Sequence, residues 1–160
     1  MSNKAQHGAG SAASLVDYFT SAHRACDGGW ADVADAADAG DAASLAAHWQ
    51  RFKNALLRHL AREEQLLFPA IEAATGMANA GPTQVMRMEH EQMRGVLEQM
   101  SAAVARGDAD ELLDQGDTLN ILIQQHNMKE EGMLYPMAER ALQVDWPALR
   151  ERLDAFEPDT

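Results

Sequence analysis

The sequence predicts an all-α protein, folded as an up-down-up-down four-helix bundle with a short C-terminal helix. Three observations support this fold class. A chain of 160 residues fits one domain with a well-buried core. Its composition is rich in Ala, Leu, Met, Gln and Glu and poor in β-branched and aromatic residues, which favours helices over strands. Four long segments carry apolar residues at helical spacing and are joined by short connections, as in a bundle.

The chain divides into a tail, a bundle and a C-terminal segment. Residues 1–10 contain two glycines and no apolar periodicity, so we expect a disordered tail in which His7 is incidental. The four-helix bundle is expected over residues 11–142, and residues 143–160 should form a short helix and a tail. Asp145, ahead of a Trp-Pro pair, is the predicted N-cap of that last helix.

The first two helices are predicted over residues 11–40 and 41–75. Gly28 and Gly29 weaken the first, but its apolar stripe resumes beyond them, so we expect one continuous helix. The second contains Pro69, which lacks a backbone N–H and should kink or break it.

The third and fourth helices are predicted over residues 83–106 and 109–142, after a loop at 76–82 that contains two glycines and a proline. Pro136 should introduce a second kink. The inward face of the fourth helix is predicted to include Met133.

Charge and cysteine content exclude several classes of function. Lys and Arg number 13 against 25 Asp and Glu, a net charge of −12, and no basic stripe is present, so we expect no nucleic-acid partner. We also expect no membrane contact, because no apolar run approaches the roughly 20 residues needed to cross a bilayer. The single Cys26 and the polar N-terminus suggest a reducing cytoplasmic location.

One motif is written twice in the chain. H-L-A-R-E-E-Q-L-L-F-P begins at His59, and H-N-M-K-E-E-G-M-L-Y-P begins at His126. Residues four apart lie on one face of a helix, so each copy directs an imidazole and a carboxylate, that of Glu63 or of Glu130, at one point. This donor pair binds iron, zinc or manganese.

The other two helices each carry one histidine on the apolar stripe. A single histidine there is usually a satisfied core residue, but four on four helices, two with a carboxylate at i+4, favour a metal site. Two buried glutamates without a partner would each cost several kcal/mol. The predicted ligands are His23, His59, Glu63, His90, His126 and Glu130.

These segments, with H-R-A-C-D at His23 and T-G-M-x-x-x-G-P-T-x-V-M-R-M-E-H-E-Q-M-R around His90, resemble the hemerythrin-like (HHE cation-binding) domain family from Leu15 to about Leu142. The resemblance implies a four-helix bundle holding two iron ions beneath an oxo or hydroxo bridge. It also divides the ligands into two histidine pairs and two shared carboxylates. His23 and His59 would bind one iron, His90 and His126 the other, and Glu63 and Glu130 would bridge them.

The sequence leaves other metals open and disfavours another fold. Zinc or manganese could replace iron, with one metal or two. A ferritin-like di-iron site needs Glu-x-x-His on two helices, whereas here His precedes Glu by four residues, so that alternative is discounted.

One position departs from the resemblance. Oxygen-carrying hemerythrins have a further histidine one turn before the third-helix ligand, where this chain has Met86. A thioether suits iron poorly, so we expect Met86 to fill the core. Both irons would then be five-coordinate with an open position, which disfavours simple oxygen carriage.

Residues beside the predicted ligands are assigned supporting roles. Asp27, four residues after His23, is more consistent with an outer hydrogen bond or a solvated position than with ligation. Glu64 and Glu131 should form interhelical hydrogen bonds or be solvated. Phe68 and Tyr135 fall about 180° from the histidines of their own motifs and should pack between helices.

The leading hypothesis is a non-haem diiron protein that binds or senses O₂, NO or peroxide at an open iron position. One alternative is iron storage, delivery or repair of iron centres, and another is a metal-dependent regulatory or interaction module. The expected partner is thus a small diatomic ligand or peroxide. The sequence identifies neither a protein partner nor a catalysed reaction.

Overall fold

The computed structural model describes residues 13–78 and 81–158, and every regular element in these ranges is a helix. The predicted tail and His7 lie outside the described residues. Four long helical segments form the bundle and are called columns below: residues 15–39, 42–75, 82–105 and 109–141. A short π-helical turn interrupts the second and the fourth column. The elements are α2 (Leu15–Ala39), α3 (Ala42–Arg62), η2 (Glu63–Leu67), α4 (Phe68–Thr75), α5 (Pro82–Ala105), α6 (Ala109–Lys129), η3 (Glu130–Leu134), α7 (Tyr135–Ala141) and α8 (Trp146–Ala155).

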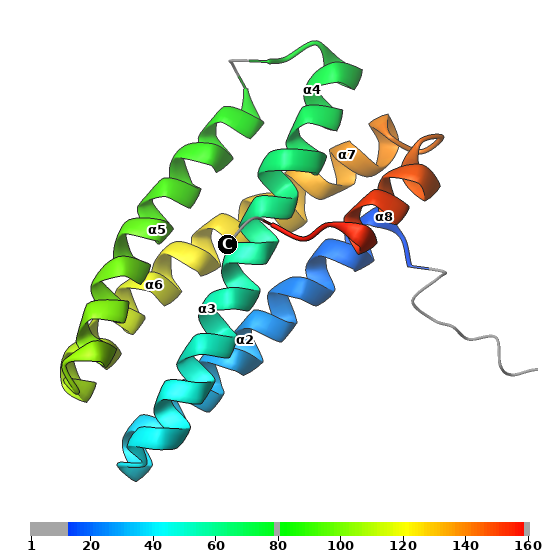
Figure 1. Cartoon of the computed structure of the whole chain (residues 1–160). Coiled ribbons are helices and arrows are strands. Elements are labelled where there is room, and N and C mark those ends of the chain that lie inside the picture. Colours follow the sequence, from blue (N-terminus) through cyan, green and yellow to red (C-terminus); the bar gives the residue numbers. More distant parts are fainter. Residues whose placement is uncertain (1–12, 79–80, 159–160) are drawn as a thin grey trace, which may run out of the picture.

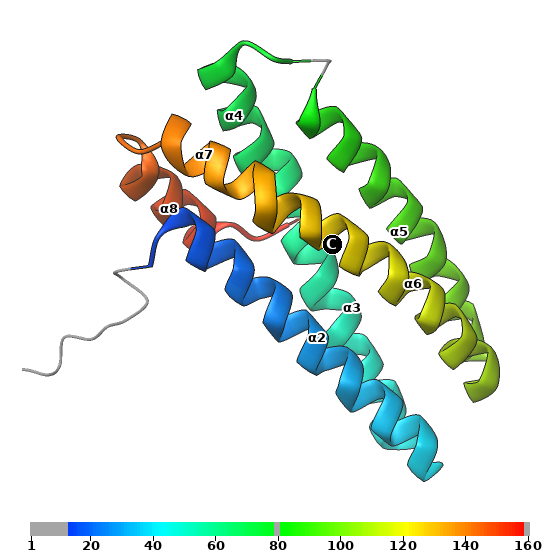
Figure 2. The same ribbon diagram turned by 180° about the vertical axis from the view of Figure 1, so that it is seen from behind.

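The columns pair in antiparallel fashion, α2 with α3 and α5 with α6, and the short α2–α3 and α5–α6 turns lie at the same end of the bundle (Figure 1). At the other end, α4 and α7 continue α3 and α6. The short α8 lies there beside α7 and the start of α2, as the reverse view also shows (Figure 2). The predicted fold class is therefore confirmed.

Local caps set the helix ends. The Ser14 side chain accepts a hydrogen bond from the backbone N–H of Asp17 at 3.1 Å and begins α2. Gly40, at φ 71°, ends this helix in the left-handed conformation. The helix runs through Gly28 and Gly29 without interruption, as predicted.

Pro69 and Pro136 each lie just after a π-helical turn, and each helical column continues past its proline. In η2 the Phe68 N–H bonds to the Glu63 carbonyl, five residues back. Pro69 has no N–H to offer, and the carbonyl of Glu64 instead accepts a hydrogen bond from the Arg87 guanidinium at 3.3 Å. The break, one of the two outcomes predicted at Pro69, does not occur, because a wider turn precedes the proline and the helix continues beyond it.

Two apolar clusters fill the bundle, and a polar layer separates them. This layer consists of the six residues predicted as ligands. The first lies toward the α2–α3 and α5–α6 turns and includes Val33, Phe52, Leu97 and Leu119. The second lies toward α8 and includes Phe19, Leu67, Met86 and Leu134. Met86 is 1% exposed, so its predicted place in the core is confirmed.

Two local predictions are wrong. Met133 is 53% exposed and Leu134 is buried in its place, because the π turn inserts one residue and rotates the rest of the column by about 100°. Asp145 does precede α8, but its side chain makes no capping hydrogen bond, since its backbone is already helical.

No helix in the described part of the chain has the length and hydropathy required to cross a lipid bilayer.

Gly116 on α6 provides a test of the packing between α2 and α6. A Cβ added there would lie 2.1 Å from Cζ2 of Trp30. We expect Gly116→Ala to lower the free energy of unfolding by about 1–3 kcal/mol, because the Trp30 ring must move. Urea denaturation measures this change.

Gly95 is the matched control. It lies exposed within α5, and a Cβ there would have no neighbour within 4 Å. Gly95→Ala should raise the free energy of unfolding by about 0.5–1 kcal/mol through helix propensity. Equal effects of the two substitutions would contradict the Trp30 contact.

Candidate metal centre

All six residues predicted as ligands converge in the middle of the bundle. Each helical column contributes at least one, and none is more than 6% exposed. They form two adjacent groups, in each of which one ligand atom per residue lies within 4.8 Å of the others. The first group is His23, His59, Glu63 and Glu130, and the second is Glu63, His90, His126 and Glu130. This arrangement is consistent with a binuclear metal site.

The shared glutamates each turn one oxygen toward each group. Oε2 of Glu63 lies 3.5 Å from Nε2 of His59, while its Oε1 lies 3.1 Å from Nε2 of His90. Glu130 repeats the pattern, with oxygens 3.0 and 3.1 Å from Nε2 of the remaining two histidines, on α2 and α6. A carboxylate that bridges two ions requires this orientation.

Helix geometry explains why the doubled motif builds this layer. His59 and Glu63 are four residues apart on one helical face, as are His126 and Glu130. Each glutamate is also the first residue of a π turn. Such turns are frequent at functional sites, because they redirect side chains without ending the helix.

Several atoms that face the centre of the layer have no hydrogen-bond partner among the described residues. They are Nε2 of His59, Oε1 of Glu63 and Oε2 of Glu130, all buried. The two carboxylate oxygens have imidazole nitrogens 3.1 Å away, but not in hydrogen-bonding geometry. An unsatisfied buried polar atom costs about 1–3 kcal/mol, and more when charged. Cations in the two groups would satisfy all three atoms, so the donor set fits metal ions.

Outer carboxylates hold three of the four histidines. In each case Nδ1 faces a glutamate on another helical column, which leaves Nε2 free to face inward. The pairs are His23 with Glu131 at 2.7 Å, His90 with Glu64 at 2.6 Å, and His126 with Glu89 at 2.8 Å. These glutamates are themselves held by Arg24, Arg94 and Lys129, respectively.

The interhelical hydrogen bonds expected of Glu64 and Glu131 are thus confirmed. The sequence pattern does not predict Glu89, which lies outside the doubled motif; its place one residue before His90 gave no indication of a contact with α6. Asp27 accepts a hydrogen bond from Gln124 at 3.3 Å and belongs to neither group.

The carboxylates and burial shift the histidine pKa values in opposite directions. Burial disfavours the charged form of His90, but the carboxylates of Glu63 and Glu64 outweigh it and raise its pKa to about 9. For His59 burial prevails and lowers the pKa to about 4. Burial would raise the pKa of Glu130, yet its contacts with imidazoles hold that pKa well below the usual range.

The expectation that Tyr135 packs away from the ligands is wrong. Its hydroxyl lies 2.7 Å from Oε1 of Glu130 and 3.1 Å from Nε2 of His23, and it also contacts Oε2 of Glu63. The π turn reduces its angular separation from His126 from about 180° to about 80°. Burial and the two carboxylates raise the Tyr135 pKa well above its usual value, so without metal the phenol is protonated.

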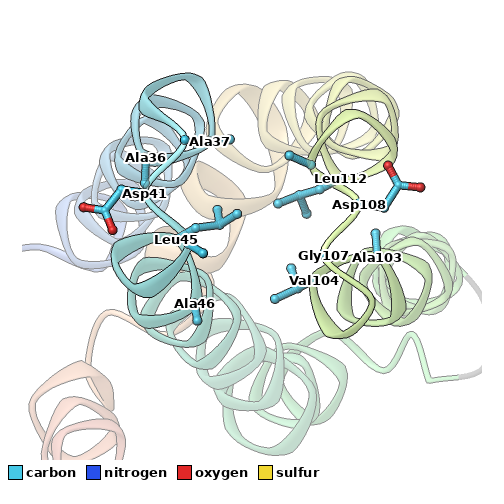
Figure 3. A pocket seen from close by; sticks show the side chains of 13 residues that line it. Ala36, Ala37, Asp41, Leu45, Ala46, Ala103, Val104, Gly107, Asp108 and Leu112 are labelled. Atoms are coloured by element: carbon cyan, nitrogen blue, oxygen red, sulfur yellow. The ribbon is translucent and has the colours of Figure 1, made fainter.

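An apolar cavity lies away from this layer. It has a volume of about 270 Å³ and lies at the end of the bundle, where the α2–α3 and α5–α6 turns meet (Figure 3). Leu45, Val104 and Leu112 point into it, and none of the six predicted ligands lines it. Ala36 on its wall is thirteen residues from His23, about 20 Å along α2.

Comparison with known proteins agrees with this geometry. The family model of the hemerythrin HHE cation binding domain matches residues 14–138. The iron-sulfur cluster repair protein YtfE of Musicola paradisiaca (strain Ech703) is 30% identical to the chain over 109 residues, which are 60% of this chain and 47% of that protein. The chain thus spans about half the length of this relative. No solved structure gives a significant match.

The raised pKa of His90 predicts how the metal-free protein responds to pH. The imidazole of His90 binds its second proton more tightly in the folded state than in the unfolded state, where its pKa is near 6.5. The stabilisation is therefore complete below pH 6.5 and is lost as the pH rises through about 9. We expect the free energy of unfolding in the presence of chelator to fall by on the order of 3 kcal/mol across this window.

His90→Gln should remove the largest part of this pH dependence. The control is His48→Gln, on a half-buried residue that contacts Arg51 and lies outside both groups. The wild-type slope should persist in the control. A flat wild-type profile between pH 6.5 and 9 would contradict the raised pKa.

Proposed function

Because the chain belongs to the hemerythrin HHE cation-binding family, we propose that it is a non-haem diiron protein that binds or senses O₂, NO or peroxide at an open iron position. His23 and His59 bind one iron, and His90 and His126 bind the other. Glu63 and Glu130 bridge the two. Imidazole nitrogen and carboxylate oxygen are donors that suit iron.

One observation carries this assignment. Each of the two buried glutamates divides its oxygens between the two histidine pairs, and three of the inward-facing atoms lack a hydrogen-bond partner within the described ranges. An ion in the second group would satisfy the free oxygens of Glu63 and Glu130, but not Nε2 of His59, which belongs to the first group. Two ions satisfy all three atoms.

The chain's own residues prepare the site for a small ligand. When bound, the irons supply electrons and a Lewis-acidic coordination position. The outer glutamates fix three imidazole rings in the orientation that presents Nε2 inward. The two apolar clusters on either side keep bulk water from the layer. Such a buried layer favours diatomic molecules or peroxide over larger substrates.

Iron handling is a second candidate, and it rests on the similarity to an iron-sulfur cluster repair protein. In that case the same six residues hold iron for delivery to a damaged centre rather than for the binding of O₂, NO or peroxide. Iron that a mild chelator removes rapidly from the folded protein would favour this function. Iron that resists the chelator and binds NO would favour the first.

Substitution of ligands tests the metal assignment. We expect wild-type protein to contain about two irons per chain by metal analysis after anaerobic loading. Glu63→Ala and His126→Ala should each abolish two-metal binding, because each removes a donor from a closed set. His48→Ala and Asp27→Ala are the controls and should retain full loading. Two irons in both ligand variants would show the assignment to be wrong.

Ligand binding tests the proposed function itself. Anaerobic addition of NO to the reduced diiron protein should change its optical and Mössbauer spectra, because an open coordination position is available. The zinc-loaded protein is the control, since it has the same fold and no redox-active ion. Unchanged iron spectra under excess NO would contradict an open position.

A further inference from the structure

Tyr135 places a phenol oxygen within one of the two ligand groups. The oxygen contacts Oε2 of Glu63, Oε1 of Glu130 and Nε2 of His23. These are the atoms that the glutamates turn toward the first group, in which Oε2 of Glu63 faces His59. The phenol therefore lies on the side of the first histidine pair.

The separations are those of neighbouring ligands around one ion. Donors bound at roughly 2.1 Å, and at right angles to one another, lie about 3 Å apart. The phenol oxygen lies 2.7 Å from Glu130 and 3.1 Å from His23. A buried phenol that donates its one proton needs a single acceptor, whereas this oxygen lies beside three candidate ligand atoms.

The doubled motif breaks its symmetry at this position. The first copy has Phe68 where the second has Tyr135. The Phe68 ring packs against His90, with ring centroids 5.5 Å apart, and has no oxygen to offer. The second histidine pair therefore has no equivalent donor from the motif.

We propose that Tyr135 is a fifth protein ligand of the ion held by His23, His59, Glu63 and Glu130. This inference rests on the diiron function proposed above. As the metal–oxygen bond forms, the phenol O–H bond breaks, and one proton is released to the buffer without any change in oxidation state. A negatively charged oxygen is a hard donor, so the position favours ferric iron.

The two ions are then unequal. The first has five protein donors, whereas the ion held by His90 and His126 has four and keeps the open position. O₂, NO or peroxide binds at the second ion. Tyr135 thus completes the coordination of one of the two ions, which the thioether of Met86 cannot do.

Spectra of the ferric protein test this ligand. Phenolate bound to ferric iron has a charge-transfer band in the visible range, and resonance Raman excitation in that band enhances the tyrosine ring modes. We expect both in the wild-type protein with two ferric ions. Tyr135→Phe should abolish them while retaining two irons, and should speed iron loss to a chelator about 10-fold or more.

Tyr18 is the matched control, because the chain contains only two tyrosines. Its hydroxyl donates to Asp154 at 3.1 Å, near α8 and outside both ligand groups. Tyr18→Phe should therefore keep the band and the Raman modes. The wild-type spectrum alone also decides the question, whether or not a variant folds.

The outcomes separate this inference from the proposed function. Two ferric ions without tyrosine Raman modes would overturn the Tyr135 ligand and leave the diiron site intact. Persistence of the band in Tyr135→Phe would do the same. Failure of the wild-type protein to bind two irons would instead overturn the proposed function.

Discussion

Two carboxylates buried side by side in the middle of the bundle are the constraint on which the rest of the site depends. Glu63 and Glu130 have no exposed surface, and their oxygens face the same small volume. Charges this close repel strongly where water is excluded, and each also loses its hydration. The surrounding imidazoles offset part of this cost. The three inward-facing atoms that make no hydrogen bond to any described residue indicate the part of the cost that remains for cations to offset.

The π turns allow regular helices to build such a layer. Each begins at a buried glutamate and ends before an aromatic residue followed by proline. The extra residue rotates the chain by about 100°, so the buried stripe continues in a new register. In the second copy this rotation directs the Tyr135 hydroxyl toward the carboxylates. The proline is accommodated because the wider turn has already changed the local hydrogen-bond pattern.

The fold class and the meeting of all six predicted ligand residues could be predicted, because both depend on a 3.6-residue period that the sequence displays openly. The wrong predictions about the bundle core and the site follow from changes in that period or from contacts across helices. Met133 and Tyr135 lie within or just after a π turn, where counting by 100° fails. Glu89 reaches His126 from another column, and helical spacing does not predict such a contact.

The outer glutamates connect the buried layer to the molecular surface. Each lies between an inward-facing histidine and a cationic side chain, Arg24, Arg94 or Lys129, that is partly or largely exposed. Ionic strength weakens exposed charge pairs, and acylation of a lysine removes its charge altogether. A change in ionic strength therefore alters how firmly three of the inward-facing imidazoles are held, whereas acylation of Lys129 affects only His126, through Glu89. The buried centre is thereby coupled to the salt content and the acylating chemistry of its surroundings.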